Sequence, residues 1–256
     1  MILYFSATGN CKYAAEALAE ATGDRTVALR DLVRAGTMRL SVAEGESLGV
    51  VMPSYWGTVP SILTDWLEGA TVTFAGGSHY CYFVGTYGAH AGRVCSEAQR
   101  AFEPLGVAFD STYTVRMVDN WNPYFHMTPD FIAEEDAYTE AQLPGVVRSV
   151  AARERGVFAE ETQSDSTLAE HKATYERLRR TELFAVERDA CVGCGLCARQ
   201  CPLAAIEMRD GAPEWVSGAC TLCLGCVHRC PVNAISFNGE TQGHGQYVNP
   251  RVRLDV

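Results

Sequence analysis

The chain has 256 residues, a length that predicts a domain of about 150 residues together with a smaller one. Hydrophobic residues make up 47% of the sequence and charged residues 20%, so we expect a packed core and little disorder. The formal net charge is −10, which argues against nucleic acid or an anionic membrane as a partner, because phosphate binding needs a basic patch.

The N-terminal residues Met1–Phe5 are apolar and carry no basic leader, and no run of about 18 apolar residues follows anywhere in the sequence. We therefore expect a cytoplasmic protein without membrane insertion. Its oligomeric state does not follow from the sequence.

A glycine-containing loop lies between the first expected strand and the first expected helix. The strand, Ile2–Phe5, is a continuous apolar run of the kind found in parallel sheets, and Ala14, Ala15 and Leu18 then repeat at helical spacing. The loop between them consists of Ser6, Ala7, Thr8, Gly9, Asn10 and Cys11. Free N–H groups and the dipole at a helix N-terminus attract an anion, hydroxyl groups add donors, and glycine permits close backbone approach. The loop therefore predicts a phosphate site.

Further apolar segments alternate with helical stretches along the first half of the chain. The expected strands are Thr26–Leu29, Leu48–Met52, Tyr80–Gly85 and Val107–Val115, and the expected helices lie near residues 60–68 and 91–103. This order predicts an α/β fold with a doubly wound parallel sheet of five strands. In such sheets, ligands bind beyond the carboxyl ends of the strands.

Two of these strands end in loops that suit an aromatic ligand. The loops supply Ser54, Tyr55, Trp56 and Gly57 after one strand and Thr86, Tyr87 and Gly88 after the other. Tyr55 and Trp56 are equally well explained as core aromatics, and Tyr87 as an ordinary loop residue. The sequence leaves open which of them stacks on a ligand.

The phosphate loop resembles the flavodoxin motif S/T-x-T-G-N-S/T, and the two later loops resemble those that hold the isoalloxazine ring in that family. The resemblance implies a flavodoxin-like, FMN-binding domain over residues 1–158. Cys11 departs from the motif, in which Ser or Thr is usual. It removes one hydroxyl donor but leaves the backbone N–H groups in place.

A helical connector is expected after this domain. Residues 130–180 are rich in Glu, Ala and Arg and carry helical patterns near 136–157 and 167–180. We expect the first helix to close the sheet, and the second, within a connector over residues 159–185, to bridge to the next domain.

Eight of the eleven cysteines fall within residues 191–230, at metal-ligand spacing. A C-x2-C-x2-C-x3-C-P run spans residues 191–202 and recurs at residues 220–231, which makes an internal duplication. In this run the fourth cysteine ligates the cluster of the other run. We therefore assign one [4Fe–4S] cluster, cluster I, to Cys191, Cys194, Cys197 and Cys230, and the other, cluster II, to Cys220, Cys223, Cys226 and Cys201. Zinc is the alternative, but zinc sites use CxxC pairs or mixed Cys and His ligands rather than two such runs.

Residues 188–240 closely resemble the bacterial two-cluster ferredoxin, which implies a small α+β domain over residues 186–256, including a C-terminal tail. A small hairpin is expected around Asp210-Gly211. The whole chain resembles the flavodoxin–ferredoxin fusion proteins of anaerobes. The likeness extends to Asp119–Pro123 and to Thr241–Pro250 in the tail, although the sequence reveals no chemistry for either segment.

Two functions follow from these cofactors. In the first, the protein carries electrons between FMN, the two clusters and a redox partner, either a protein or a small-molecule acceptor. In the second, it is a flavin-dependent reductase whose ferredoxin domain supplies electrons to a substrate at FMN. No motif supplies a catalytic acid, so we favour the carrier and assign no catalytic residue. A redox sensor would need an effector or DNA-binding domain, which the sequence does not show.

Overall fold

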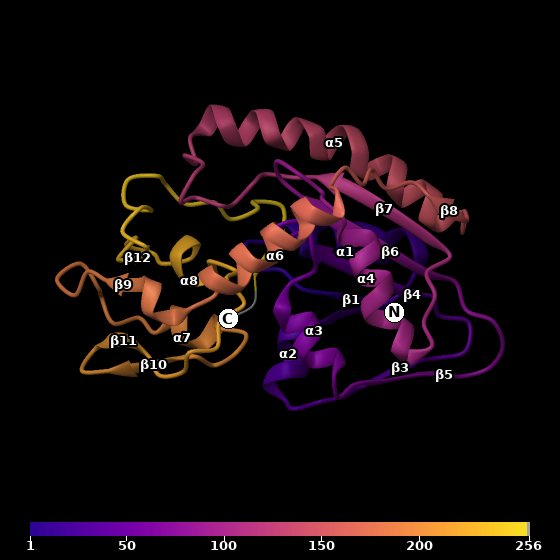
Figure 1. Ribbon diagram of the computed structural model, residues 1–256, viewed down its shortest axis with the longest axis horizontal. Coiled ribbons are helices and arrows are strands. Elements are labelled where there is room, and N and C mark those ends of the chain that lie inside the picture. The colour runs from indigo at the N-terminus through magenta and orange to yellow at the C-terminus, as the bar shows by residue number, and fades with distance from the viewer. Residues whose placement is uncertain (255–256) are drawn as a thin grey trace.

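A parallel sheet organises the N-terminal part of the structure. The computed structural model describes residues 1–254 and shows a six-stranded sheet in the order β2-β1-β4-β6-β7-β8 (Figure 1). The strands are β1 (Ile2–Tyr4), β2 (Thr26–Ala28), β4 (Leu48–Pro53), β6 (Cys81–Tyr87), β7 (Ser111–Arg116) and β8 (Gly156–Val157). All of their pairings are parallel, so the carboxyl ends of the strands meet at one edge.

Helices cover both faces of this sheet. They are α1 (Asn10–Thr22), α2 (Leu29–Arg34), α3 (Ser61–Leu67), α4 (Val94–Phe102) with the 3-10 turn η1 (Glu103–Leu105), and α5 (Pro129–Ala151). Successive strand residues point to opposite faces. In β4, Val51 therefore joins the core under α1 and α5, whereas Val50 and Met52 join the core under α3 and α4. The expected α/β class is confirmed.

The sheet has one strand more than the five expected from the sequence. β8 is two residues long and pairs with β7 at the edge, in a segment that the sequence pattern placed at the end of a helix spanning 136–157. That helix, α5, begins earlier, at Pro129, where the Thr128 side chain accepts a hydrogen bond from Phe131 N, and it ends at Ala151. Thr-Pro is a helix-start signal, so this boundary was readable from the sequence.

Two further strands lie outside the main sheet. β3 (Arg39–Val42) and β5 (Thr71–Phe74) pair in parallel with each other. Sequence analysis does not predict them, because only Leu40 and Val42 of β3 are buried, and β5 is at most half-buried along its length. Such short alternating segments carry a weak apolar signal.

The cysteine-rich part is a small α+β unit. Its elements are β9 (Phe184–Val186), α7 (Leu196–Gln200), β10 (Ile206–Arg209), β11 (Ala212–Trp215), α8 (Gly225–His228) and β12 (Ile235–Phe237). β9 pairs antiparallel with β12, and β10 with β11. The hairpin expected at Asp210-Gly211 is confirmed, with φ angles of 48° and 77°, as a tight two-residue turn requires.

Helix α6 (Asp165–Leu178) and the 3-10 turn η2 (Thr181–Leu183) join the two parts (Figure 1). The buried Tyr175 of α6 fixes this junction, because its hydroxyl donates to Thr221 O (2.9 Å) and accepts from the Ser61 N–H (3.0 Å). The two parts are therefore packed against each other and not merely tethered. No helix in the described part of the chain is long and apolar enough to cross a membrane.

Candidate functional site

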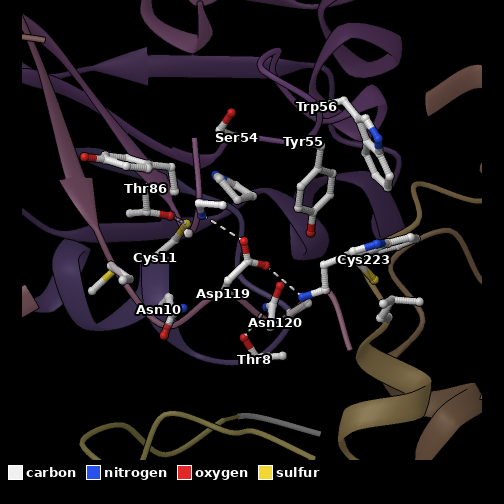
Figure 2. Close-up of a pocket in the computed structure, with 18 of the residues that line it drawn as sticks. Thr8, Asn10, Cys11, Ser54, Tyr55, Trp56, Thr86, Asp119, Asn120 and Cys223 are labelled. Carbon is white, nitrogen blue, oxygen red and sulfur yellow. Dashed lines mark hydrogen bonds between the residues drawn. The ribbon is translucent and has the colours of Figure 1, made fainter. Parts of the chain in front are cut away.

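A pocket lies at the carboxyl edge of the parallel sheet, where the loops after β1, β4, β6 and β7 converge (Figure 2). Its cavity measures about 290 Å³, close to the lower end of ligand-pocket volumes at about 300 Å³. The sequence-predicted residues that line it are Ser6, Ala7, Thr8, Asn10, Cys11, Ser54, Tyr55, Trp56, Gly57, Thr86, Tyr87 and Gly88. Of the predicted set, only Gly9 lies outside the lining.

The loop after β1 is held in a defined shape at the start of α1. Gly9 precedes the helix with φ of 109°, a conformation that favours glycine, and its N–H donates to the Ser6 hydroxyl (3.1 Å). The buried Thr8 hydroxyl accepts from Asn120 Nδ2 (2.7 Å), so its own proton remains available for donation. These hydroxyls and the backbone N–H groups of the helix N-terminus form a donor set that suits an anion.

Cys11 occupies the motif position where a hydroxyl is usual. Its Sγ lies 3.1 Å from Thr86 Oγ1, so it links the first loop to the loop after β6. Burial raises the pKa of this thiol to about 12, and it therefore stays protonated at neutral pH. Cys11 therefore places no negative charge beside this donor set.

Aromatic side chains form the wall of the pocket that faces the cysteine-rich part. Trp56 meets the edge of Trp121, with ring centroids 4.6 Å apart, and stacks on Tyr175 at 5.7 Å. Tyr55 points into the pocket (Figure 2) and contacts the edge of Tyr175 at 6.0 Å. Tyr55, Trp56 and Trp121 line the pocket, and their contacts with Tyr175 join the pocket wall to the junction between the two parts of the molecule.

Asp119 is a pocket residue to which sequence analysis assigns no role. Its carboxylate accepts hydrogen bonds from the backbone N–H groups of Ala89 and Trp121, both at 2.9 Å (Figure 2). Burial raises the pKa of Asp119, an effect that these two bonds oppose. A Cβ at Gly88 would lie 2.2 Å from the Asp119 Cβ, so glycine is required there. The signal was available, because Asp119 follows a strand of the parallel sheet and such strands end at one edge.

The eight predicted ligand cysteines gather around two further cavities. The inner cavity is lined by Cys201, Cys220, Cys223 and Cys226, and the outer cavity by Cys191, Cys194, Cys197 and Cys230. Each cavity thus combines three cysteines of one run with the fourth cysteine of the other. This grouping is compatible with the crossed ligand assignment, which stays a prediction.

Backbone N–H groups already point at sulfur atoms in both cavities. The N–H of Leu222 donates to Cys220 Sγ in the inner cavity, and that of Ala234 to Cys230 Sγ in the outer one, both at 3.2 Å. Such bonds stabilise thiolate ligands and help to set a cluster's potential. The three remaining cysteines, Cys11, Cys81 and Cys95, are buried and line neither cavity.

The inner cavity adjoins the pocket. Cys223 lines both, and its neighbours Leu222 and Leu224 line the pocket as well. Ser6 and Ala7 of the first loop, in turn, line the inner cavity. Among the residues that the structure describes, the outer cavity shares no lining residue with the pocket. The inner cavity is therefore the one in contact with the pocket.

Comparison with known proteins agrees with the cysteine pattern. Residues 184–231 match the family model of the 4Fe-4S dicluster domain. A search of curated proteins finds no match to the chain. The molecule thus consists of an N-terminal parallel α/β domain followed by a dicluster, ferredoxin-like domain. Its eight clustered cysteines hold two [4Fe–4S] clusters, which implies electron transfer through iron–sulfur centres and a redox partner.

Proposed function

We propose that the protein carries electrons between FMN, bound in the pocket of a flavodoxin-like N-terminal domain, and the two [4Fe–4S] clusters, and exchanges them with a redox partner. The observation that carries this proposal is the position of Cys223, which lines both the pocket and the inner cavity. A ligand in the pocket and a cluster held by Cys223 are neighbours. The proposed domain boundaries are residues 1–158 and 186–256, with the connector at 159–185.

The pocket residues suit the two ends of FMN. At one end, the hydroxyls of Ser6 and Thr8 and the N–H groups at the start of α1 offer donors to a phosphate, and the helix dipole favours its charge. At the other end, the loops at 54–57 and 86–88 offer aromatic side chains and glycine backbone to a flat ring. All of the cofactor-binding residues predicted from the sequence remain in this proposal.

FMN supplies a centre that holds one or two electrons, whereas each cluster passes one electron at a time. The surrounding side chains isolate and shape the site. Leu222 and Leu224 are buried beside Cys223 and exclude water from the wall between the pocket and the inner cavity. Asp119 accepts hydrogen bonds from the two loops after β6 and β7 and so fixes their positions relative to each other.

The outer cavity provides the exchange point with a partner. Cys194 is exposed, and the Val192 side chain beside it is 63% exposed, so a partner can approach this cavity from solvent. With the crossed ligand sets, we propose the order FMN, cluster II, cluster I, partner. The partner is a redox protein or a small-molecule acceptor.

A flavin-dependent reductase is the second candidate, and Asp119 is the observation in its favour. A carboxyl group in the pocket whose pKa is raised by burial is a suitable proton donor to a substrate reduced at the flavin. Turnover of a nitro compound, quinone or unsaturated acid that disappears in Asp119→Asn would support the reductase. Electron delivery to a partner protein without such turnover would support the carrier.

Anaerobic purification followed by assays of iron, acid-labile sulfide and flavin tests the proposal. We expect about eight irons and about eight sulfides per chain, since each of two cubanes holds four of each, together with bound FMN. Stoichiometric zinc without sulfide would exclude the clusters. Failure to bind added FMN in cluster-replete protein would exclude the flavin.

A further inference from the structure

The C-terminal tail lies against the phosphate loop, residues 6–11. We propose that residues 244–253, here called the strap, complete the phosphate site: they position the loop, and they make FMN binding depend on the neighbouring cluster domain. This inference rests on the proposed binding of FMN in the pocket.

The strap orients Asn10, the first residue of α1. The Asn10 Oδ1 atom accepts hydrogen bonds from the Tyr247 hydroxyl (2.9 Å) and from Asn249 Nδ2 (3.2 Å). The Asn10 Nδ2 atom donates to Val118 O (3.0 Å). All three side chains of this group, those of Asn10, Tyr247 and Asn249, are buried. A buried amide with partners on both sides has one orientation, so the strap defines the first turn of the helix whose N–H groups face the phosphate.

The strap also contacts the backbone of the loop. The N–H of Asn249 donates to Thr8 O at 2.7 Å. A Cβ at Gly9 would lie 2.8 Å from the Asn249 Cβ and 2.9 Å from Val252 Cγ2. The loop motif accounts for Gly9 by the close approach of a phosphate to the backbone. In the structure, its bare Cα also makes room for the strap.

Charged contacts hold the last residues of the strap on the N-terminal domain. Arg251 forms two hydrogen bonds with the Asp136 carboxylate, at 2.8 and 2.6 Å, and lies 3.1 Å from Glu140. Lys12 of α1 donates to Arg253 O (2.6 Å). Surface pairs of this kind stabilise little by themselves, so the buried bonds to Asn10 and Thr8 carry the positioning.

The first residues of the strap are anchored on the cluster domain. Gln246 Nε2 donates to Val227 O (2.6 Å) and to Cys230 O (2.8 Å). Cys230 lines the outer cavity and closes the second cysteine run. The strap is therefore attached to the backbone of a predicted cluster ligand at one end and to the phosphate loop at the other.

His228 adds a second connection. The backbone N–H of Tyr247 donates to His228 Nδ1 (3.1 Å), so the imidazole carries its proton on Nε2, which donates to Asn120 O (2.6 Å). Asn120 in turn donates through Nδ2 to Thr8 Oγ1 (2.7 Å). Two chains of hydrogen bonds therefore connect His228 to the phosphate loop. One passes through the strap and the other through Asn120.

This arrangement predicts coupling between the two cofactor sites. Any loss of order between Cys226 and Cys230 removes the anchors of the strap and the donor to Asn120 together. Because metal binding orders its ligand segment, FMN should bind more weakly to cluster-free protein, and bound FMN should in turn stabilise the cluster-bound form.

The test is equilibrium titration of full-length, cluster-replete and flavin-free protein with FMN and, separately, with riboflavin. Tyr247→Phe removes one hydrogen bond and keeps the ring, and Asn249→Ala removes another and keeps the Cβ. Gln246→Ala releases the strap at a residue that does not line the pocket. Tyr124→Phe is the matched control, because its side chain is 75% exposed. Iron content and the denaturation midpoint are measured for every variant.

Each strap variant is expected to bind FMN about three- to tenfold more weakly, since one or two buried or partly buried hydrogen bonds are lost. Each should bind riboflavin like the wild type, since riboflavin has no phosphate. Equal losses for both flavins, or unchanged FMN affinity, would overturn the inference. If Asn249→Ala and Gln246→Ala impair folding, the FMN affinity of Tyr247→Phe alone tests the inference. A wild-type protein that binds no flavin, or riboflavin as tightly as FMN, would instead contradict the proposed function.

Discussion

The cluster domain and the pocket of this molecule are built in opposite ways. The cysteines of the cluster domain lie within residues 191–230 in two repeated runs, and short backbone loops alone bring three of each four together. The pocket takes its lining from loops at 6–11, 54–57, 86–88 and 119–121, and from residues 222–224 in the other domain. Metal binding is therefore encoded in local spacing, whereas the pocket exists only once the sheet and the domain junction have formed.

The largest expected effect tests whether the spacing of the cysteines determines the ligands of each cluster. Cys201→Ala should remove the cluster of the inner cavity and leave the outer one, with a loss of about four of eight irons, because the fourth cysteine of each run serves the opposite loop. Iron assay and electron paramagnetic resonance of the reduced protein measure this. Cys81→Ala, a change in β6, is the control for loss of a cysteine elsewhere.

Cys191→Ala should give the complementary spectrum, since Cys191 lines the outer cavity. If Cys201→Ala and Cys191→Ala remove the same cluster, the crossed assignment is wrong. Local cysteine spacing would then not be enough to determine which four cysteines bind each cluster.

The next largest effect tests the dependence of the pocket on tertiary structure. Gly9→Val should weaken FMN binding by at least about 100-fold and leave the iron content unchanged, because a β-branched residue is strained at φ of 109° and its Cβ would strike the strap. Flavin titration and an iron assay check both halves. Gly77→Val is the matched control, since no atom lies within 4 Å of a Cβ at that position. FMN affinity within tenfold of the wild type would refute the prediction.

A kinetic experiment asks whether the two regions work as one unit. In rapid mixing of the oxidised protein with a one-electron donor, reduction of the flavin through the clusters should be independent of protein concentration, because Cys223 connects the inner cavity to the pocket within one chain. Cys201→Ala should slow this phase. A rate that rises in proportion to protein concentration would show that transfer occurs between molecules.

The smallest expected effect concerns Asp119, whose pKa is raised by the burial that the pocket imposes. A carboxyl with a raised pKa in the folded state stabilises the fold while protonated, and this contribution is lost as pH rises through the folded pKa. Relative to the wild type, Asp119→Asn should therefore gain stability as pH rises from the ordinary carboxyl pKa of 3.8 through the raised folded pKa, and the difference should level off above it. Denaturant midpoints of both proteins measure the difference. A difference that is constant with pH would contradict this account.

The elements whose signal lies within one segment of the sequence are the ones that the sequence predicts correctly. The apolar run at Ile2–Phe5 followed by the loop and helix is present as expected, and so is the hairpin at Asp210-Gly211. The prediction of five strands was wrong, and so was the predicted end of the helix near 136–157, because β8 has only two residues and owes its conformation to pairing with β7. Pairing of that kind leaves almost no periodic pattern in the sequence.

The sequence by itself determined the eight cysteine positions, the class of each domain and the loops that meet at the pocket, because these depend on spacing and apolar periodicity within short stretches of chain. Only the tertiary structure decided that the Asp119 carboxylate bridges the loops after β6 and β7, that Cys223 lies between the pocket and the inner cavity and that Tyr247 and Asn249 reach Asn10. The physical reason is distance along the chain. A hydrogen bond between residues 10 and 247 depends on how the two domains pack, and no local pattern records it.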